Sequence, residues 1–437
     1  MIFFSVFFLF TQAPDTLWTR TYGGTGWDEA CEVESREDGG YIVIGETQLS
    51  GNIYAWLLKM DADGDTLWTK IYNGEFWAIE QTSDRGYVIA GSICQPGENN
   101  LDAYLLKTDP AGDTLWSRCY GGALDDIAYA VQPTFDGGYI LAGQSNSYSD
   151  VYVVKTDSLG NMQWQKTYGG TYRDYCFSAK QVNDGGYIFA GYTAYLTDPW
   201  ADVYIIRTDS IGDTLSTRTY GTPGNNDEAY CVQCVSGGGY IVAGWTCSFG
   251  QGGDIWLLRL SDRGDSLWTR TYGGLDFEYG SSVQETGDGG FVIAGYTRSF
   301  GAGYEDVYVV KTDSVGDTLW TKTIGGAGQD EGYSISMTAD NGCIIAGRTN
   351  SYGSGSWDVY LVKLAHQTGV VEEKKQTSDP EYMIPTVFHG SLRYLSGMKN
   401  CKVFDIMGRQ INPASIGPGI YFIEINGKIE QKVIIAK

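Results

Sequence analysis

The chain has 437 residues, of which 60 are glycine and 14% are aromatic, a composition typical of many short strands joined by tight turns. Its net charge of −23 repels phosphate backbones and argues against a nucleic-acid partner. The nine cysteines do not recur at a fixed spacing, so they do not indicate a disulfide framework.

Residues 1–13 are predicted to be a secretory signal peptide. Ile2 to Phe10 is an apolar run too short to span a bilayer, and Thr11-Gln12-Ala13 places small residues before a cut after Ala13. A buried first strand is the alternative interpretation. The signal peptide leads us to expect a secreted or cell-surface protein. No other stretch is apolar enough to be a transmembrane segment.

A repeat of roughly 50 residues dominates the rest of the chain. Each unit reads as four strands, which we name a to d in chain order. In the fifth unit strand a is EAYCVQCV (228–235); a tight turn leads to strand b, of the type YIVAGWT (240–246). Strand c is of the type DIWLLRL (254–260), and a second tight turn leads to strand d, SLWTRTY (266–272). Four antiparallel strands per repeat predict the blade of a β-propeller.

Strands a, b and c each occur seven times, whereas the seven copies of strand d are displaced by one unit. The first copy, PDTLWTRTY (14–22), precedes any strand a, and no copy follows DVYLVKL at 358–364. We therefore expect residues 14–364 to form an all-β, seven-bladed β-propeller closed by its N-terminal strand, which supplies the outer strand of the last blade. A linear solenoid would instead need polar caps at both ends.

The turn before strand d also resembles a known family. Asp157, Gly160 and Trp164 in DSLGNMQW match the tryptophan-docking motif of pyrroloquinoline-quinone-type propellers. The resemblance implies that the tryptophan packs between neighbouring blades. It does not extend to the cofactor, because the chain has no adjacent cysteine pair and seven rather than eight units. We expect no cofactor.

Residues that recur in every unit are expected to serve the scaffold. The docking tryptophans are Trp18, Trp68, Trp116, Trp164, Trp268 and Trp320, and Ser216 replaces the seventh. Aspartates that open strand c are expected to bond to loop amides; they are Asp102, Asp150, Asp202, Asp254, Asp306 and Asp358, with Asn52 near the missing position.

Binding is expected on the face formed by the d–a and b–c loops, which vary in length and content on a rigid scaffold. Six carboxylates near the start of strand a could ring the channel mouth and hold a cation or a polyhydroxyl ligand; they are Asp28, Asp126, Asp174, Asp227, Glu278 and Asp330. Because they recur, a repeated cap of the d–a loop is the favoured alternative.

Aromatic residues that break the repeat are the second set of ligand-binding candidates. Placed in the d–a or b–c loops with no common position, they are Trp27, Trp77, Tyr172, Trp200, Phe277 and Tyr304. Aromatic rings beside carboxylates suit recognition of a glycan or a protein. Packing of the loops is the alternative.

No catalytic residue and no metal site is predicted. His366 and His389 both lie outside the repeats, which removes histidine-dependent nucleophiles and histidine metal sites from the propeller. We expect a non-enzymatic binding module. The alternative is a carbohydrate-active hydrolase that uses two channel carboxylates.

The end of the chain is a different module. Residues 365–380 read as a polar linker, and CKVFDIMGRQI (401–411), GPGIYFIEING (417–427) and KVIIAK (432–437) as three strands. With Phe404 to Arg409 and Pro418 to Phe422, residues 381–437 resemble the C-terminal sorting domain of type IX secretion cargo. The resemblance implies a small β-sandwich and the secretion machinery as a partner. An adhesive β-sandwich is the alternative.

Overall fold

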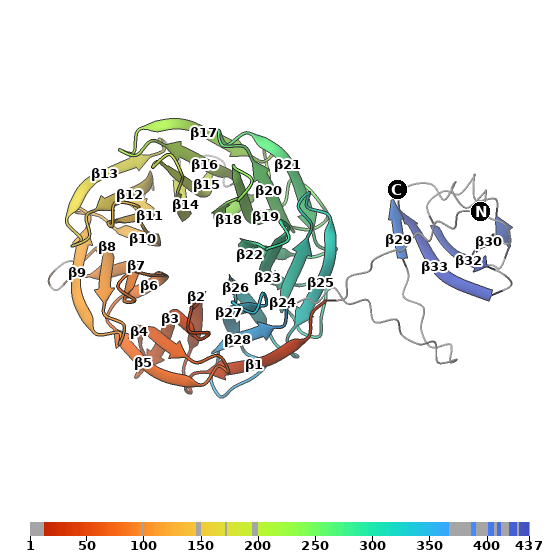
Figure 1. The fold of residues 1–437 in the computed structure, drawn as a ribbon, viewed down its shortest axis with the longest axis horizontal. Coiled ribbons are helices and arrows are strands. Elements are labelled where there is room, and N and C mark those ends of the chain that lie inside the picture. The colour runs from red at the N-terminus through yellow and green to blue at the C-terminus, as the bar shows by residue number, and fades with distance from the viewer. Residues whose placement is uncertain are drawn as a thin grey trace. The chain divides into compact units, whose positions relative to one another are not determined.

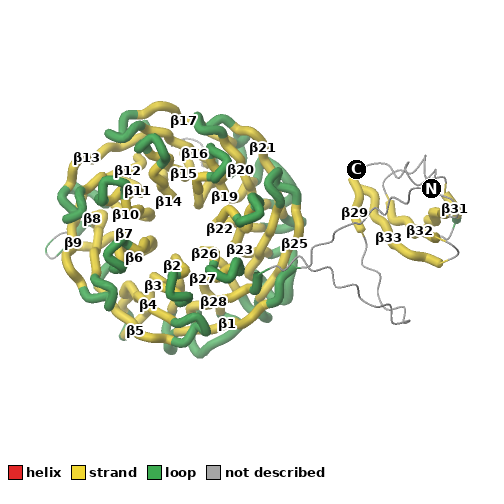
Figure 2. The backbone as a smooth tube through the Cα atoms, in the orientation of Figure 1, coloured by secondary structure: helices red, strands yellow, loops and turns green. Residues whose placement is uncertain are grey.

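The computed structural model describes residues 13–95, 97, 99–145, 150–170, 173–194, 200–366, 386–389, 401–405, 409–411, 419–425 and 428–436. The chain divides into two units, residues 1–369 and 370–437. All the regular structure described is β-strand (Figure 2). Within these residues there is no helix that could cross a membrane.

The first unit is a ring of seven four-stranded antiparallel sheets, the blades (Figure 1). Blade 1 comprises β2 (Asp28–Ser35), β3 (Tyr41–Leu49), β4 (Asn52–Met60) and β5 (Thr66–Tyr72). Blade 2 comprises β6 (Glu75–Gln81), β7 (Tyr87–Cys94), β8 (Leu101–Thr108) and β9 (Thr114–Tyr120). Blade 3 comprises β10 (Asp126–Pro133), β11 (Tyr139–Ser145), β12 (Asp150–Thr156) and β13 (Met162–Tyr168). The seven-bladed propeller predicted from the repeat is confirmed.

The remaining blades repeat this order. Blade 4 comprises β14 (Arg173–Gln181), β15 (Tyr187–Ala194), β16 (Ala201–Thr208) and β17 (Thr214–Tyr220). Blade 5 comprises β18 (Asp227–Cys234), β19 (Tyr240–Thr246), β20 (Asp254–Leu260) and β21 (Ser266–Tyr272). Blade 6 comprises β22 (Glu278–Glu285), β23 (Phe291–Thr297), β24 (Asp306–Thr312) and β25 (Thr318–Ile324). Blade 7 contains β26 (Asp330–Met337), β27 (Cys343–Thr349) and β28 (Asp358–Leu364), and its fourth strand is β1 (Thr16–Tyr22).

The hydrophobic core lies between neighbouring blades rather than inside any one of them. Strands b and c are buried on both faces, as in β11, where Tyr139 to Ala142 are at most 4% exposed. One apolar cluster joins Val43 and Leu58 of blade 1 to Ala346 and Leu361 of blade 7. Because each blade covers its neighbour, no blade can bury its apolar surface alone.

At six of the seven junctions strand d of one blade docks on the c–d turn of the next blade. The Trp116 ring of β9 lies over Gly160 of blade 3, so that a Cβ added there would be 2.5 Å from the ring. At the end of the same strand the Tyr120 hydroxyl donates a hydrogen bond of 2.6 Å to the Gly160 carbonyl. The same tyrosine bond recurs from Tyr22, Tyr72, Tyr168, Tyr220 and Tyr272. The expected packing of these tryptophans between blades is confirmed.

The junction between blades 6 and 7 differs because blade 7 has no c–d turn. β1 pairs antiparallel with β28, from Thr16 opposite Leu364 to Tyr22 opposite Val359. The backbone carbonyl of Pro14 stands where the turn would be and accepts a hydrogen bond of 2.9 Å from Lys322 Nζ of β25. β25 ends in Ile324 rather than tyrosine, which fits the missing glycine carbonyl.

In the second unit the described residues form one five-stranded sheet in the order β29-β33-β32-β30-β31. The strands are β29 (Thr386–His389), β30 (Cys401–Asp405), β31 (Gln410–Ile411), β32 (Gly419–Ile425) and β33 (Lys428–Ala436). β29 runs parallel to β33, and the other pairs are antiparallel.

Two matched glycine substitutions test the close contact between a docking tryptophan and the c–d turn. Gly160 and Gly264 both have positive φ, 77° and 81°, so alanine strains both backbones alike. At Gly264 the docking residue is Ser216, and the nearest atom to an added Cβ is 3.7 Å away. We expect Gly160→Ala to destabilise the propeller by about 1–3 kcal/mol more than Gly264→Ala, because overpacking displaces the indole. Urea unfolding measures both, and equal losses would contradict this docking role.

Candidate functional site

A cavity of about 370 Å³ occupies the centre of the ring. It is lined by strand a of every blade, namely β2, β6, β10, β14, β18, β22 and β26, which surround the axis in Figure 1. Because strand a is the innermost strand, its side chains are the only ones that every blade can present to the axis at the same height. The residues on strand a therefore decide what the cavity can bind.

A β-bulge in each strand a turns one extra side chain toward the cavity. In β10 the register shifts between Ala128 and Ala130, which leaves Tyr129 unpaired, and the same shift occurs in all seven copies. Opposite the bulge stands a glycine of strand b, such as Gly143, where a Cβ would collide with a strand-a carbonyl. The seven bulge residues are Cys31, Trp77, Tyr129, Phe177, Tyr230, Ser281 and Tyr333, and all line the cavity.

Four of these side chains form a continuous aromatic arc. The ring centroids are 5.1 Å apart for Trp77 and Tyr129, 5.3 Å for Tyr129 and Phe177, and 5.4 Å for Phe177 and Tyr230. The arc runs over blades 2 to 5. The other half of the cavity, over blades 6 and 7, is lined by Ser281, Ser282, Gln284, Ser334 and Ser336, together with Tyr333 and Ile335. One wall is thus aromatic, whereas the facing wall carries mostly hydroxyl and amide groups.

An acidic cluster with one lysine lies toward the a–b hairpins. Lys180 of blade 4 forms an ion pair with Glu80 of blade 2 at 3.2 Å. Glu32 and Glu34 of blade 1 accept hydrogen bonds from the Ile79 and Gln81 amides of blade 2, at 2.7 and 2.9 Å. These bonds join blades 1 and 2 at the axis.

Burial controls the protonation of this cluster. Burial, with the charge of Glu80, raises the pKa of Glu32 to about 7. The same two causes raise the pKa of Glu34 well above its ordinary value. Burial alone would lower the pKa of Lys180, but the charges of Glu80 and Glu32 outweigh it and raise that pKa. Lys180 is therefore a permanent cation, while Glu32 titrates near neutral pH.

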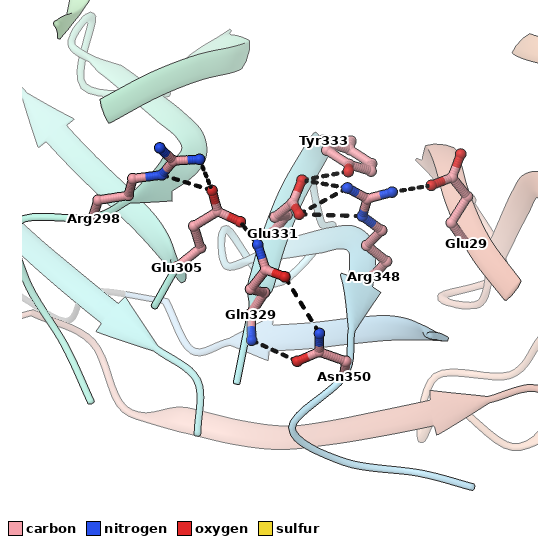
Figure 3. A network of polar contacts seen from close by, with 8 residues as sticks. All are labelled: Glu29, Arg298, Glu305, Gln329, Glu331, Tyr333, Arg348 and Asn350. Carbon is pink, nitrogen blue, oxygen red and sulfur yellow. Dashed lines mark hydrogen bonds and ion pairs between the residues drawn. The ribbon is translucent and has the colours of Figure 1, made fainter. Parts of the chain in front are cut away.

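On the loop face a polar network joins blades 6, 7 and 1 (Figure 3). Arg348 binds Glu331 of its own blade at 2.9 Å and Glu29 of blade 1 at 3.1 Å. Glu331 also accepts the Tyr333 hydroxyl, and the Arg348 guanidinium lies 4.2 Å from the centroid of Trp357. Arg348 therefore links blade 7 to blade 1 on the loop face.

A second arginine of the network is held in the same way. Glu305, which is 3% exposed, accepts Arg298 at 2.6 Å and Gln329 at 2.6 Å (Figure 3). The Arg298 guanidinium lies over the rings of Phe277 and Tyr304, at 5.7 and 5.0 Å from the centroids.

The six predicted carboxylates lie at the start of strand a, where they hold the d–a loops. Asp28 accepts the Gly24 amide at 2.9 Å, and Glu278 accepts the Gly274 amide at 2.7 Å. Asp126, Asp174 and Asp330 accept the amide four residues earlier in the same way, and Asp227 accepts Thr222 and Ser248. Among the described residues that line the cavity none of the six appears. Such bonds from loop amides are the contacts expected if these carboxylates cap the d–a loops.

The predicted aromatic residues are spread over different environments. Trp77 lies in the cavity at a bulge and therefore shares a common position with Tyr129 and Phe177, which corrects its assignment to an irregular loop. Trp27 pairs with Trp357 across blades 1 and 7, and Phe277 pairs with Gly253 across blades 6 and 5. Trp200 and Tyr304 are 44% and 63% exposed on the loop face. Tyr172 lies outside the described residues.

Comparison with known proteins supports the architecture and assigns no activity. No family model matches the chain. The curated regulatory protein FlaEY of Caulobacter vibrioides is 24% identical over 222 residues, 44% of this chain, and the match spans only 23% of that protein.

Solved structures share the fold at low identity. A polysaccharide lyase, an ulvan lyase bound to -[GlcA(1-4)Rha3S]-, superposes with a TM-score of 0.52 at 10% identity, over 79% of this chain and 96% of that one. Streptogramin B lyase has a TM-score of 0.48 at 12% identity, over 79% and 97% of the two chains. Drosophila Plexin A, in complex with Semaphorin 1b, has a TM-score of 0.48 at 8% identity, over 93% and 95%. At these identities the likeness is one of fold alone.

The aromatic arc was missed by sequence reasoning although a signal for it exists. Six of the seven bulge residues stand three positions after the loop carboxylate, as Tyr129 follows Asp126 and Tyr230 follows Asp227, and Trp77 stands three positions after Gly74. In a strand without a bulge, side chains alternate strictly between the two faces of the sheet, and this alternation does not predict that these residues face the central cavity. Only the extra residue in the register reveals that they face the axis.

The raised pKa of Glu32 predicts a pH-dependent stability. The folded chain binds the Glu32 proton up to about pH 7, whereas the unfolded chain releases it near 4.5, so stability falls as pH rises between these values. Glu32→Gln keeps an oxygen for the Ile79 amide and should remove a loss on the order of 2 kcal/mol. Thermal unfolding at a series of pH values tests this, with the exposed Glu37→Gln as control. An unchanged slope in Glu32→Gln would contradict the burial of this charge.

Proposed function

We propose that the protein is a non-enzymatic binding module that takes a glycan in its central cavity. The observation that carries the proposal is the division of the cavity into an aromatic wall and a hydroxyl- and amide-bearing wall. Sugars present apolar C–H faces that stack on aromatic rings, and their hydroxyls exchange hydrogen bonds with serine and glutamine side chains. Trp77, Tyr129 and Tyr230 would stack on the ligand, while Ser281 and Gln284 would bind its hydroxyls.

The rigidity of the site supports binding. The rings stand on strands rather than on loops, and the inner strands are joined to one another by side chains, such as Ser178 accepting the Val232 amide and Ser334 accepting the Val33 amide. A preformed site loses little conformational entropy when a ligand enters. Little of the free energy gained from ligand contacts is therefore offset by ordering the site.

The acidic cluster does not favour the alternative, a hydrolase. Glu34 accepts the Gln81 amide and Glu80 pairs with Lys180, whereas the two carboxyls of a glycosidase stand about 5–10 Å apart with the sugar between them. Glu32 is also bound to a backbone amide. The carboxyls that line the cavity are thus engaged with backbone amides and with Lys180.

Glycan-array binding of the full chain, followed by a reducing-sugar assay on each bound glycan, tests the proposal. We expect binding without sugar release, and a loss of affinity of about tenfold or more in Trp77→Ala because one stacked ring disappears. Phe135→Ala removes a ring that is 71% exposed on the opposite hairpin face, and it should bind as the parent does. Release of reducing sugar would favour the hydrolase, and an array without any bound glycan would overturn both.

We also propose that the chain is exported, with residues 1–13 as signal peptide and residues 381–437 as a type IX sorting domain that forms a small β-sandwich. Support comes from the motif itself and from β30 and β32, whose positions coincide with the predicted strand runs at 401–411 and 417–427. We propose further that β1, which pairs with β28, closes the ring, and that the turns before strand d belong to the pyrroloquinoline-quinone-type class of repeats.

The export proposal is tested in a bacterium that has a type IX system. A chain truncated after residue 380 should remain in the periplasm, whereas the full chain should reach the cell surface or the medium, because only the full chain carries the address. Surface proteolysis and fractionation report the difference. Equal export of both chains would show that residues 381–437 have no sorting role.

A further inference from the structure

The junction between blades 1 and 2 departs from the others at the loop-face end of the cavity. The residue after the strand-b glycine contacts the next blade at this level. In blade 7 it is Arg348, which forms an ion pair of 3.1 Å with Glu29 of blade 1 (Figure 3). In blade 5 it is Trp245, whose ring centroid lies 4.8 Å from that of Tyr279 in blade 6. In blade 1 it is Glu46, which pairs in register with Glu29.

Glu46 is a buried carboxyl group among other carboxyl groups. Its side chain belongs to a residue that is 6% exposed, and burial, followed by the charges of Glu29 and Glu75, raises its pKa to about 8. Strand c adds no opposite charge, because β4 places Ala55 opposite Glu46. Among the described residues Glu46 therefore has like charges for neighbours and takes part in no ion pair.

An unpartnered hydroxyl group lies beside these carboxylates. Ser92 of β7 is 1% exposed, and the register of β6 and β7 places it opposite Glu75. Its Oγ atom is buried without a hydrogen-bond partner. Gln144, at the same position of blade 3, also has a buried Oε1 atom without a partner. Since buried polar atoms in proteins are nearly always paired, a ligand that brings its own hydrogen-bond donors fits this end of the cavity.

The carboxylates of this junction continue into the central cavity. Burial, followed by the charges of Glu29, Glu46 and Glu32, raises the pKa of the Cys31 thiol, and Cys31 lines the cavity. We name the carboxylates of blades 1 and 2 along this path the acidic stripe; they are Glu29, Glu32, Glu34, Glu46, Glu75 and Glu80. Arg348 pairs with Glu29 and Lys180 pairs with Glu80, whereas the other four members form no ion pair within the described chain.

Short loops leave the acidic stripe open to the loop face. Only Ser50 and Gly51 join β3 to β4, and only Asn73 and Gly74 join β5 to β6. In blade 5, by comparison, residues 247–253 join β19 to β20. A ligand can therefore enter the cavity along blades 1 and 2 without displacing a long loop.

We propose that the ligand of the central cavity is a glycan with free amino groups, whose ammonium groups bind the acidic stripe while its sugar rings stack on the aromatic arc. The inference rests on the proposed glycan site and names the class of sugar. An ammonium group donates three hydrogen bonds and brings the positive charge that the stripe lacks. Trp77, the first ring of the arc, lies on β6 between Glu75 and Glu80, so both kinds of contact are adjacent. Acidic sugars would be repelled.

Calorimetric titration of the full chain with β-1,4-linked tetramers of glucosamine, N-acetylglucosamine and glucose tests the proposal. We expect the glucosamine tetramer to bind about tenfold or more tightly than the other two, because it alone carries ammonium groups. Glu46→Gln keeps the volume of the side chain and removes one carboxylate, so it should abolish most of this preference. Glu37→Gln, an exposed carboxylate outside the acidic stripe, should keep the full preference.

The same titration has a second readout in the protons released. The free chain holds a proton on Glu46 below about pH 8, and a bound ammonium group favours the ionised form, so binding should release protons and strengthen from about pH 5 to pH 6. Glu29 and Cys31 of β2 and Glu75 of β6 face Glu46 and contribute to the same release. Titration in two buffers with different heats of ionisation measures this release, which Glu46→Gln should reduce.

The outcomes separate this inference from the proposed function. Equal affinity for the glucosamine and N-acetylglucosamine tetramers, or a preference that Glu46→Gln retains, would overturn the amino-sugar ligand and leave the glycan site standing. Binding of tetralysine that Glu46→Gln weakens, with no binding of any sugar, would assign the acidic stripe to a basic peptide and overturn both.

Discussion

The propeller depends on the docking of the outer strand of each blade on the c–d turn of the next. Two contacts make this junction: an indole that covers a glycine, and a tyrosine hydroxyl that donates to the carbonyl of the same glycine. The glycine is required because it has positive φ and because any Cβ would strike the indole. The places where the contact is missing carry matching changes. Ser216 faces an uncrowded Gly264, and Ile324 faces a blade that has no c–d turn.

This outer docking sets the conditions for the interior. With its apolar faces covered by neighbours and its outer edge docked, each blade leaves only strand a at the axis, and the bulge there presents one extra side chain. The position of that side chain is imposed by the scaffold, whereas its identity is free, since it is cysteine, serine, tyrosine, phenylalanine or tryptophan in different blades. A pseudo-symmetric ring can therefore hold an asymmetric cavity with an aromatic wall and a polar wall.

The position of each carboxylate in the ring depends on whether its position in the repeat is acidic in nearly every blade. The carboxylates present in nearly every blade hold the loops and meet in pairs at the blade junctions, while Glu32, Glu34 and Glu80, whose positions carry a carboxylate in one or two blades only, gather at the axis around Lys180. Recurrence thus separates acidic groups that belong to the scaffold from those that belong to the cavity. Glu331 and Glu29 have a third role: through Arg348 they bind blade 7 to blade 1 on the loop face.

The sequence by itself determined the number of blades, the four strands in each and the docking tryptophans. These follow from a repeat that can be counted along the chain without any knowledge of which residues are in contact. It also indicated that Asp28 and its counterparts could cap loops, since a residue present in nearly every unit serves what every unit needs. Only the tertiary structure decided which side chains meet. The bulge that turns Trp77 and Tyr129 to the axis is a one-residue shift of register, which alternation along a strand does not reveal. The partners Asp254 and Glu278 belong to different blades, and their approach results from the packing of one sheet on the next.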